Sequence, residues 1–222
     1  MKRIARSGAG AGCAQIHKFN CTGILQALLF LLPALSLPLG AVEPEADIQR
    51  GIACHERAVT VPENNIEEGK AILYPYINGY PLAKGYYGSF LTLESAGHAR
   101  RNNMLQATSL LDEGTALIDE AVRSAPDLVD LRVLRMINSY EISSHSPFDR
   151  YGIMKTDMDW LEARRNQFMA SLLGILELYK GLYCLKNRRI TAALAAFEAC
   201  IRVSPGSQEA REAERQLQRY GE

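Results

Sequence analysis

Residues 179–205 read YKGLYCLKNRRITAALAAFEACIRVSP, and this stretch decides the fold that we predict for the chain. It predicts two amphipathic helices joined by a tight basic turn. In the second helix, apolar residues recur three and four positions apart and share one buried stripe: Ile190, Ala193, Leu194, Phe197, Cys200 and Ile201. Small residues at Gly181 and Ala193 let two helix backbones approach closely, and Phe197 fills the space beside them. Pro205 ends the second helix, because a proline disfavours helical geometry in the residue before it.

The spacing of the residues in this second helix recurs twice upstream. The offsets of Ala193, Phe197, Cys200 and Pro205 are repeated by Gly114, Ile118, Ala121 and Pro126, and by Gly69, Leu73, Tyr76 and Pro81. Copies at matching offsets predict a repeated unit, with one unit between the first two prolines and about two before the last. We expect the intervening unit to begin with the helix DLVDLRVLRMINSYEI, residues 127–142. A poorly patterned helix around residues 151–161 is expected to complete it.

The mutual spacing of Gly181, Ala193, Phe197 and Pro205 resembles the tetratricopeptide (TPR) repeat pattern. The chain departs from that pattern at the tryptophan, leucine and tyrosine slots, which fall on Glu177, Lys180 and Cys184. The resemblance implies an all-α fold over about residues 44–220, with four degenerate helix pairs stacked as a right-handed superhelix. An ordinary helical hairpin of no repeat family is the alternative.

Further helices are expected on either side of these units. The apolar periodicity predicts helices over about residues 46–59, 65–73, 81–96, 103–124 and 165–185. A last helix, residues 208–220, alternates Glu and Arg and has few apolar residues. A polar outer face is what the end of a stacked array requires, so we predict a C-terminal capping helix there.

The first 41 residues resemble a secretory signal peptide. They hold four basic residues and no acidic one, an apolar run over residues 24–39, and the small pair Gly40-Ala41 at their end. The run is short for a membrane span. Cleavage after Ala41 is the interpretation that we prefer, and it implies a periplasmic or secreted protein. An uncleaved N-terminal anchor is the alternative.

The charge balance bears on the kind of partner. The chain of 222 residues has 25 Lys and Arg and 25 Asp and Glu, and without the first 41 residues 21 basic residues face 25 acidic ones. A mildly acidic chain without a basic stripe argues against nucleic acid. The hydrophobic share of 47% is enough to bury a core, and we expect one helical repeat domain over residues 44–222.

Export would leave three cysteines, Cys54, Cys184 and Cys200, because Cys13 and Cys21 would be removed with the leader. An odd number leaves at least one thiol unpaired within the chain. Cys184 and Cys200 fall on opposite helices of the 179–205 hairpin and could face one another. A disulfide between them depends on a Cα separation that sequence does not supply. We prefer buried thiols that pack as small hydrophobic side chains.

Two groups of residues near the N-terminus could bind a ligand or simply pack. His55 shares an apolar stripe with Ile48, Ile52 and Val59, and no other metal ligand has a suitable spacing, so we predict a core histidine. Five tyrosines then follow closely: Tyr74, Tyr76, Tyr80, Tyr86 and Tyr87. They could stack a ligand, but a helix–helix core with hydroxyls that reach the surface is the preferred interpretation.

Candidate binding residues lie on the helix over residues 127–142. Its buried side is expected to carry Val129, Val133, Met136 and Tyr140, and its opposite side Arg132, Arg135 and Ser139. Two arginines on an exposed face could grip a carboxylate of a partner peptide through their fork-like donors. A simple solvated surface is the interpretation that we prefer.

No sequence motif for catalysis stands out, and we predict a protein that is no enzyme and uses no cofactor or metal. Asp157 and Asp159 are two residues apart and should point to different faces of a helix. What the TPR resemblance implies is a protein–protein interaction scaffold of the cell envelope. A peptide or protein would lie in a concave groove lined by the first helix of each pair, and specificity should reside on helices upstream of residues 179–205.

A small hydrophobic ligand, bound for an envelope transport system, is the second functional hypothesis. Its basis is the apolar run Ile175, Leu178, Leu182 and Leu185, which could line a cavity.

Overall fold

The computed structural model describes residues 43–62 and 64–221. The expected leader, residues 1–41, lies outside the described residues, as do Cys13, Cys21 and the predicted cleavage position. In the described part the chain forms nine α-helices and two short 3₁₀ segments and no strand, which confirms the all-α prediction. The elements are α1 (Pro44–Thr60), α2 (Asn65–Leu73), η1 (Tyr74–Tyr76), α3 (Pro81–Arg100), α4 (Met104–Ser124), α5 (Val129–His145), α6 (Tyr151–Glu162), η2 (Arg165–Gln167), α7 (Ala170–Lys186), α8 (Ile190–Val203) and α9 (Gln208–Tyr220).

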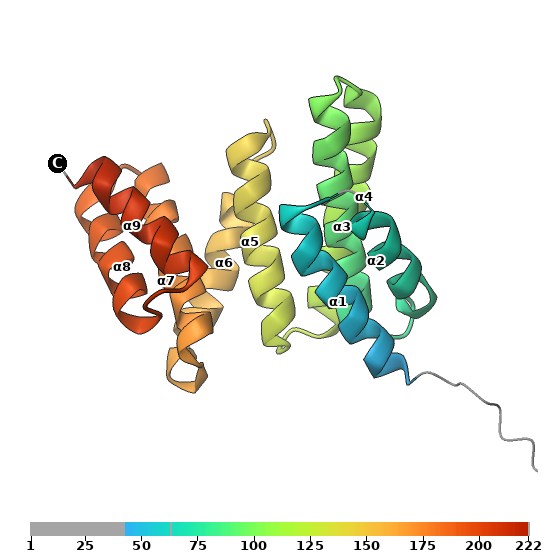
Figure 1. The fold of residues 1–222 in the computed structure, drawn as a ribbon, viewed down its shortest axis with the longest axis horizontal. Coiled ribbons are helices and arrows are strands. Elements are labelled where there is room, and N and C mark those ends of the chain that lie inside the picture. The colour runs from blue at the N-terminus through green and yellow to red at the C-terminus, as the bar shows by residue number, and fades with distance from the viewer. Residues whose placement is uncertain (1–42, 63, 222) are drawn as a thin grey trace, which may run out of the picture. The chain divides into compact units, whose positions relative to one another are not determined.

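The helices pack as successive pairs. The closest packing joins α1 to α2, α3 to α4, α5 to α6 and α7 to α8, and the last helix, α9, packs on α8 and α7 (Figure 1). The first helix of each pair also contacts the first helix of the next pair, and the second helix of each pair contacts the first helix of the next. Each paired helix therefore packs most closely on its partner within the pair and next on its neighbours along the chain.

Small residues close the helix pairs, as predicted for Gly181. A Cβ atom on Gly181 would lie 2.3 Å from Cε1 of Phe197, whose side chain is completely buried. In the α3–α4 pair the two backbones meet directly, because a Cβ on Gly88 would lie 2.6 Å from the carbonyl oxygen of Gly114. A side chain at Gly88 would require a helix to move, whereas a side chain at Gly181 would require the Phe197 ring to shift.

The intervening unit contains a further copy of the repeated spacing. Met154, Met158 and Leu161 of α6 have the offsets of Ala193, Phe197 and Cys200, and all three are buried. The corresponding closing position is Asn166, within η2, where the other copies have proline. The missing proline and the large side chains of α6 conceal this copy in the sequence.

Hydrogen bonds between buried polar side chains join the first helices of neighbouring helix pairs. His55 of α1 lies 2.8 Å from Oγ of Ser89 in α3, and Asn138 of α5 donates a hydrogen bond to Oγ1 of Thr92 in α3 at 2.7 Å. The His55 ring also meets Phe90 edge-on, and burial lowers its pKa to about 4. The prediction of a packed core histidine is confirmed.

The cysteines of the described part are free and buried, with exposed fractions of 1% for Cys54, 2% for Cys184 and 0% for Cys200. This agrees with thiols that pack as small hydrophobic side chains. None of the described helices combines the length and the apolar character that a bilayer crossing requires.

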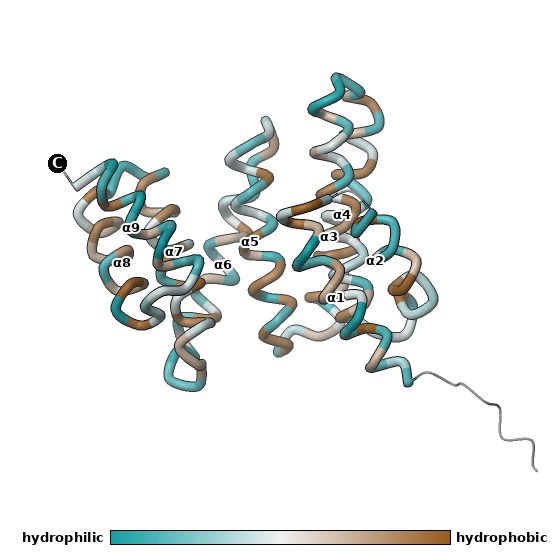
Figure 2. Tube along the Cα trace, in the orientation of Figure 1, coloured by the Kyte–Doolittle hydropathy of each residue, from teal (hydrophilic) through white to brown (hydrophobic). Residues whose placement is uncertain are grey.

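The observed boundaries of α7 differ from the predicted ones, whereas those of α9 agree with them. The helix expected from about residue 165 begins only at Ala170, because Arg165–Gln167 form a 3₁₀ turn and Met169 is extended. The final helix has the predicted limits, and its start is capped by Ser207, whose hydroxyl accepts from the Ala210 amide at 3.0 Å. Most of this helix is hydrophilic (Figure 2), while Ala210 and Ala213 are completely buried.

Candidate functional site

The residues predicted to bind a partner lie inside the structure. Arg132 and Arg135 have side-chain exposed fractions of 13% and 12%, and Ser139 is completely buried. The prediction of an exposed face is therefore wrong. The physical reason is that α5 is packed on several sides, by α3, α4, α6 and α7, so that it has no fully solvated face.

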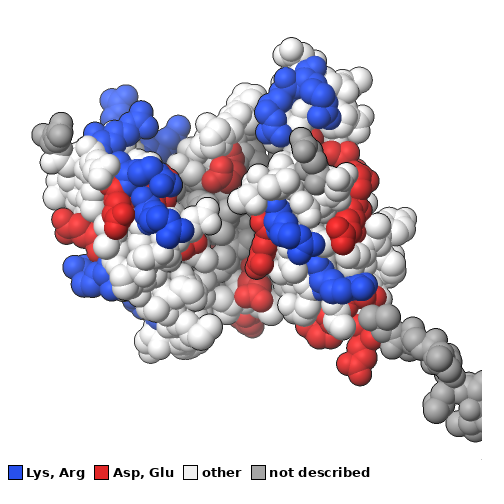
Figure 3. Space-filling view, in the orientation of Figure 1, with Lys and Arg blue, Asp and Glu red and all other residues white. Residues whose placement is uncertain are grey.

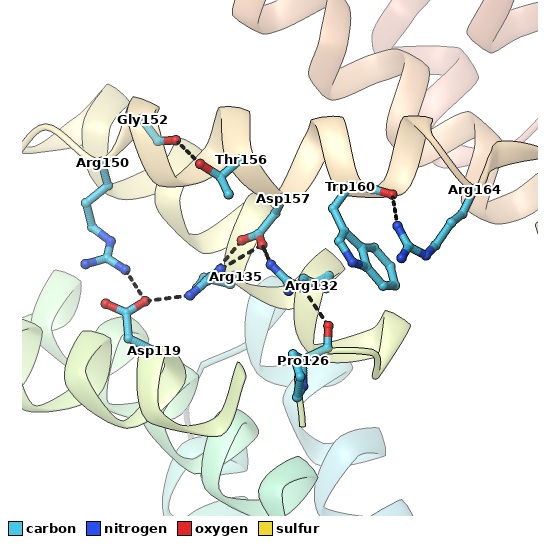
Figure 4. A network of polar contacts seen from close by, with 10 residues as sticks. All are labelled: Asp119, Pro126, Arg132, Arg135, Arg150, Gly152, Thr156, Asp157, Trp160 and Arg164. Carbon is cyan, nitrogen blue, oxygen red and sulfur yellow. Dashed lines mark hydrogen bonds and ion pairs between the residues drawn. The ribbon is translucent and has the colours of Figure 1, made fainter. Parts of the chain in front are cut away.

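The two arginines do grip a carboxylate, but it belongs to the same chain. Arg135 donates to both oxygens of Asp157 through Nε and Nη2, each at 2.7 Å, and Arg132 donates to Oδ1 of Asp157 at 2.8 Å (Figure 4). Asp157 is completely buried, whereas Asp159 is exposed, so the two aspartates face opposite ways as predicted.

This polar network continues to the preceding helix pair. Asp119 of α4 accepts from Arg150 at 2.8 Å and from Arg135 at 3.5 Å, and Nε of Arg132 donates to the Pro126 carbonyl at 2.9 Å (Figure 4). The network thus connects α4, α5 and α6. The network engages Arg132 and Arg135 within the chain, so neither arginine is free to bind the carboxylate of a partner, and it leaves the buried Nε of Arg150 without a hydrogen-bond partner in the described part.

A groove lies elsewhere, between α5, α7 and α9. It consists of two adjoining recesses of about 350 Å³ and about 320 Å³, which share Tyr140, Leu182 and Gln216. Three members of the apolar run of α7 line the first recess, namely Ile175, Leu178 and Leu182, and Leu185 lines the second. The run proposed from the sequence therefore lines an open groove, although Leu178 is 7% exposed and packs mainly in the core.

Tyrosines give the groove an aromatic wall. The ring of Tyr140 meets Tyr179 edge-on at a centroid distance of 5.4 Å and Tyr151 at 6.3 Å. Tyr151 continues the row to Tyr183 at 6.5 Å. Burial raises the pKa of Tyr140 and, together with the nearby Glu141 carboxylate, that of Tyr179. Both hydroxyls therefore stay protonated near neutral pH and can act as hydrogen-bond donors.

The two ends of the groove differ in charge. The first recess is lined by Glu141, Glu209 and Glu212, with Arg215 as its cation. The second is lined by Lys186 and Arg219 and has no acidic residue in its wall. Glu141 accepts a hydrogen bond from Tyr179 at 3.5 Å, and partial desolvation raises the pKa of its carboxyl.

One wall of the groove comes from α9, which the sequence identifies only as a polar cap. Glu209, Glu212, Gln216 and Arg219 line the two recesses at successive offsets of three, four and three residues. Polar residues at this spacing form one face of a helix. This spacing was the signal in the sequence that α9 has a polar face that could line a binding surface.

The upstream tyrosines do not form a comparable wall. Tyr74 and Tyr80 are 63% and 41% exposed, while the hydroxyl of Tyr76 donates to Asp47 at 2.6 Å. Tyr86 is packed against the apolar core that α1, α2 and α3 form, and burial raises its pKa to about 12. The cluster thus consists of core contacts with some rings at the surface, as preferred from the sequence.

Among the described residues, no group of three or more His, Cys, Asp or Glu side chains could hold a metal ion. Comparison with protein-family models, with curated proteins and with solved structures finds no match to this chain.

Proposed function

We propose that this chain is a TPR-like scaffold that binds a peptide or protein segment in the groove between α5, α7 and α9, without catalysis and without a cofactor. The observation that carries the proposal is the origin of the groove walls. Apart from Tyr151 at the start of α6, every residue that lines the two recesses comes from α5, α7 or α9. These are the first helices of the last two pairs and the terminal helix, which is where the TPR resemblance implies a ligand.

The packing order supports the finer part of this proposal, a right-handed superhelix of degenerate repeats. Contacts run from each pair to the next, and the buried spacing of Ala193, Phe197 and Cys200 recurs in α6. Two departures from the TPR pattern also compensate one another. Glu177 is buried, at 3% exposed, and it pairs with Lys180 at 3.6 Å and with Arg165 at 2.8 Å.

The charges of the groove give the bound segment a direction. A cationic side chain of the segment would lie near Glu141 and Glu209, and an acidic one near Lys186 and Arg219. Apolar side chains would lie over Leu182, which both recesses share. Aromatic rings provide contact area at low entropic cost, because a tyrosine has only two side-chain torsions to restrict.

A site-specific crosslinking experiment tests this function. A photoreactive amino acid at Gln216, in the shared part of the groove, should crosslink one partner, and Leu182→Glu should abolish the product. The same amino acid at Thr191, an exposed position of α8, is the control. Equal crosslinking from both positions, or an unchanged product with Leu182→Glu, would contradict a partner in the groove.

The small hydrophobic ligand remains the second candidate, because the apolar run lines a recess of about 350 Å³, within the size range of ligand sites. Three glutamates in the same recess favour the peptide. Native mass spectrometry of the protein isolated from its own cells separates the two: a retained lipid or metabolite, lost with Leu182→Glu, would favour the ligand. The envelope location, periplasmic, secreted or anchored, stays a prediction that rests on residues 1–41.

A further inference from the structure

Several basic residues form no ion pair within the described part of the chain, unlike Arg132 and Arg135. Six of them lie at the C-terminal end of a helix or in the turn that follows it. They are Arg100, Arg101, Lys186, Arg188, Arg189 and Arg219. All but Arg219 are followed within five residues by an exposed apolar side chain at the start of the next helix. Unpaired charge and exposed apolar surface therefore occur together.

The fold gathers these residues on one edge. Arg100 and Arg101 lie at the turn between α3 and α4, residues 186–189 lie at the turn between α7 and α8, and Arg219 is in the last turn of α9. The helices α3, α7 and α9 run in the same direction, so their C-terminal ends lie along the upper edge of Figure 1. Figure 3 shows Lys and Arg over the top of the α3–α4 pair and over the top of α7–α9. We call this surface the turn edge.

The two turns share one backbone design. Asn102 and Arg188 are left-handed, with φ of 60° and 57°, and the residue after each is the N-cap of the next helix. The amide of that residue donates back into the preceding helix, from Asn103 to the His98 carbonyl at 3.0 Å and from Arg189 to the Cys184 carbonyl at 2.9 Å. Each turn thus presents an arginine pair next to the first side chains of the following helix.

Those first side chains are apolar and protrude into solvent. Leu105 is 86% exposed, Met104 57% and Ile190 40%. An exposed leucine does not make a protein more soluble, so its position beside unpaired arginines indicates another role. Apolar groups flanked by cations are typical of surfaces that meet a membrane interface.

We propose that the turn edge binds the surface of an anionic phospholipid bilayer. Arg100 and Arg101 contact lipid phosphates, and Leu105 and Met104 enter the interfacial region beside them. Anionic headgroups attract such cations, each of which raises affinity by about fivefold. Nucleic acid would satisfy the cations but would leave the apolar side chains in water, so the bilayer fits both features. The residues that contact the bilayer in this proposal lie at the turn between α3 and α4 and line neither recess, although Lys186 and Arg219 of the turn edge also line the second recess.

The test uses the full chain with Leu105→Trp and follows the fluorescence of the introduced tryptophan, after subtraction of the signal of Trp160 in the parent chain. Vesicles contain phosphatidylglycerol and brominated phosphatidylcholine, and the comparison vesicles contain only the latter. Quenching of the introduced tryptophan is expected with the anionic vesicles alone. The quenching reports only on the surroundings of position 105. Binding of the chain to the vesicles through residues 1–41 alone would therefore not quench the introduced tryptophan.

Arg100→Glu with Arg101→Glu should raise the lipid concentration for half-maximal quenching by at least about 25-fold. The matched control is Arg123→Glu with Arg202→Glu, the same change at exposed positions at the opposite ends of α4 and α8, and it should leave quenching unchanged. Absence of quenching on anionic vesicles, or an equal loss in the control, overturns the proposal. A DNA duplex that changes the emission of the introduced tryptophan while vesicles do not would assign the edge to nucleic acid instead.

Discussion

Arg135 holds Asp157 through two parallel hydrogen bonds of 2.7 Å, and the aspartate side chain is completely buried between α5 and α6. Removing the charge of Asp157 would leave two arginines without their shared partner. We expect Asp157→Asn to lower the free energy of unfolding by about 3 kcal/mol, the order found when a buried ion pair loses one member. Urea unfolding followed by circular dichroism measures this.

Asp159→Asn is the control for that change. Asp159 lies two residues further along α6 and its side chain is 60% exposed, so its replacement should stay within about 0.5 kcal/mol of the parent. Equal effects of the two substitutions would show that the network does not stabilise the junction of α5 and α6.

Gly88 and Gly114 allow α3 and α4 to touch through their backbones, with 2.6 Å between a Cβ built on Gly88 and the Gly114 oxygen. Because a carbonyl oxygen cannot rotate away as a side chain does, we expect Gly88→Ala to cost about 3 kcal/mol in stability. Gly152→Ala is the matched control in α6, where nothing lies within 4 Å of an added Cβ. In thermal denaturation, Gly88→Ala should lower the melting temperature and Gly152→Ala should raise it, because alanine favours the helix at an open position.

His55 should make stability depend on pH. Burial lowers its pKa from 6.5 to about 4, so the folded protein binds this proton less readily than the unfolded chain does. The stabilising contribution is complete above pH 6.5 and is lost as the pH falls from there to about 4, by about 3 kcal/mol in total.

His55→Gln removes this titration, and the difference in unfolding free energy between parent and variant should change over that pH interval. Carboxylates that titrate in both proteins cancel in the difference. A difference that stays constant from pH 7 to pH 4 would contradict a neutral, buried His55.

Arg188 adopts a left-handed conformation, with φ of 57°, at a position where Asn102 stands in the equivalent turn between α3 and α4. Asparagine tolerates this region better than arginine does. We expect Arg188→Asn to raise the free energy of unfolding by about 0.5 to 1 kcal/mol, measured by urea unfolding. Arg188→Gln removes the same charge at the same position but gains none of the tolerance of asparagine for a positive φ, and it serves as the reference.

Cys184 and Cys200 should remain thiols even under oxidising conditions. Burial raises the pKa of Cys200 to about 11, so little thiolate exists for exchange near neutral pH. Alkylation of the native protein, followed by peptide mass spectrometry, should leave both residues unmodified until denaturant is added. A linked Cys184–Cys200 peptide from air-oxidised protein would contradict this prediction.

The hairpin of residues 179–205 shows how far local pattern reaches. Gly181, Ala193 and Phe197 pack as predicted, because a small residue facing a large one in adjacent helices depends on spacing that can be read directly. The copy in α6 escapes such reading because Met154 and Met158 fill the same places without a closing proline.

The candidate site was less accessible to such reasoning. The buried side of α5 was assigned from its own periodicity, yet Ser139, which was placed on the opposite side, is completely buried, and Leu131, Leu134 and Asn138 are buried as well. Periodicity describes one helix, whereas burial depends on which helices surround it. For α5 these come from both neighbouring pairs.

Sequence alone determined the helical class, the limits of the final helix and the tight packing of its last hairpin, because these depend on residues within a few turns of one another. Only the tertiary structure decided that Asp157 would occupy Arg132 and Arg135, that α9 would complete a groove with Tyr140 and Leu182, and that cations from three distant turns would share an edge. Each of these depends on contacts between residues separated by many positions. Such contacts are set by the order and direction in which the pairs stack, which no single segment encodes.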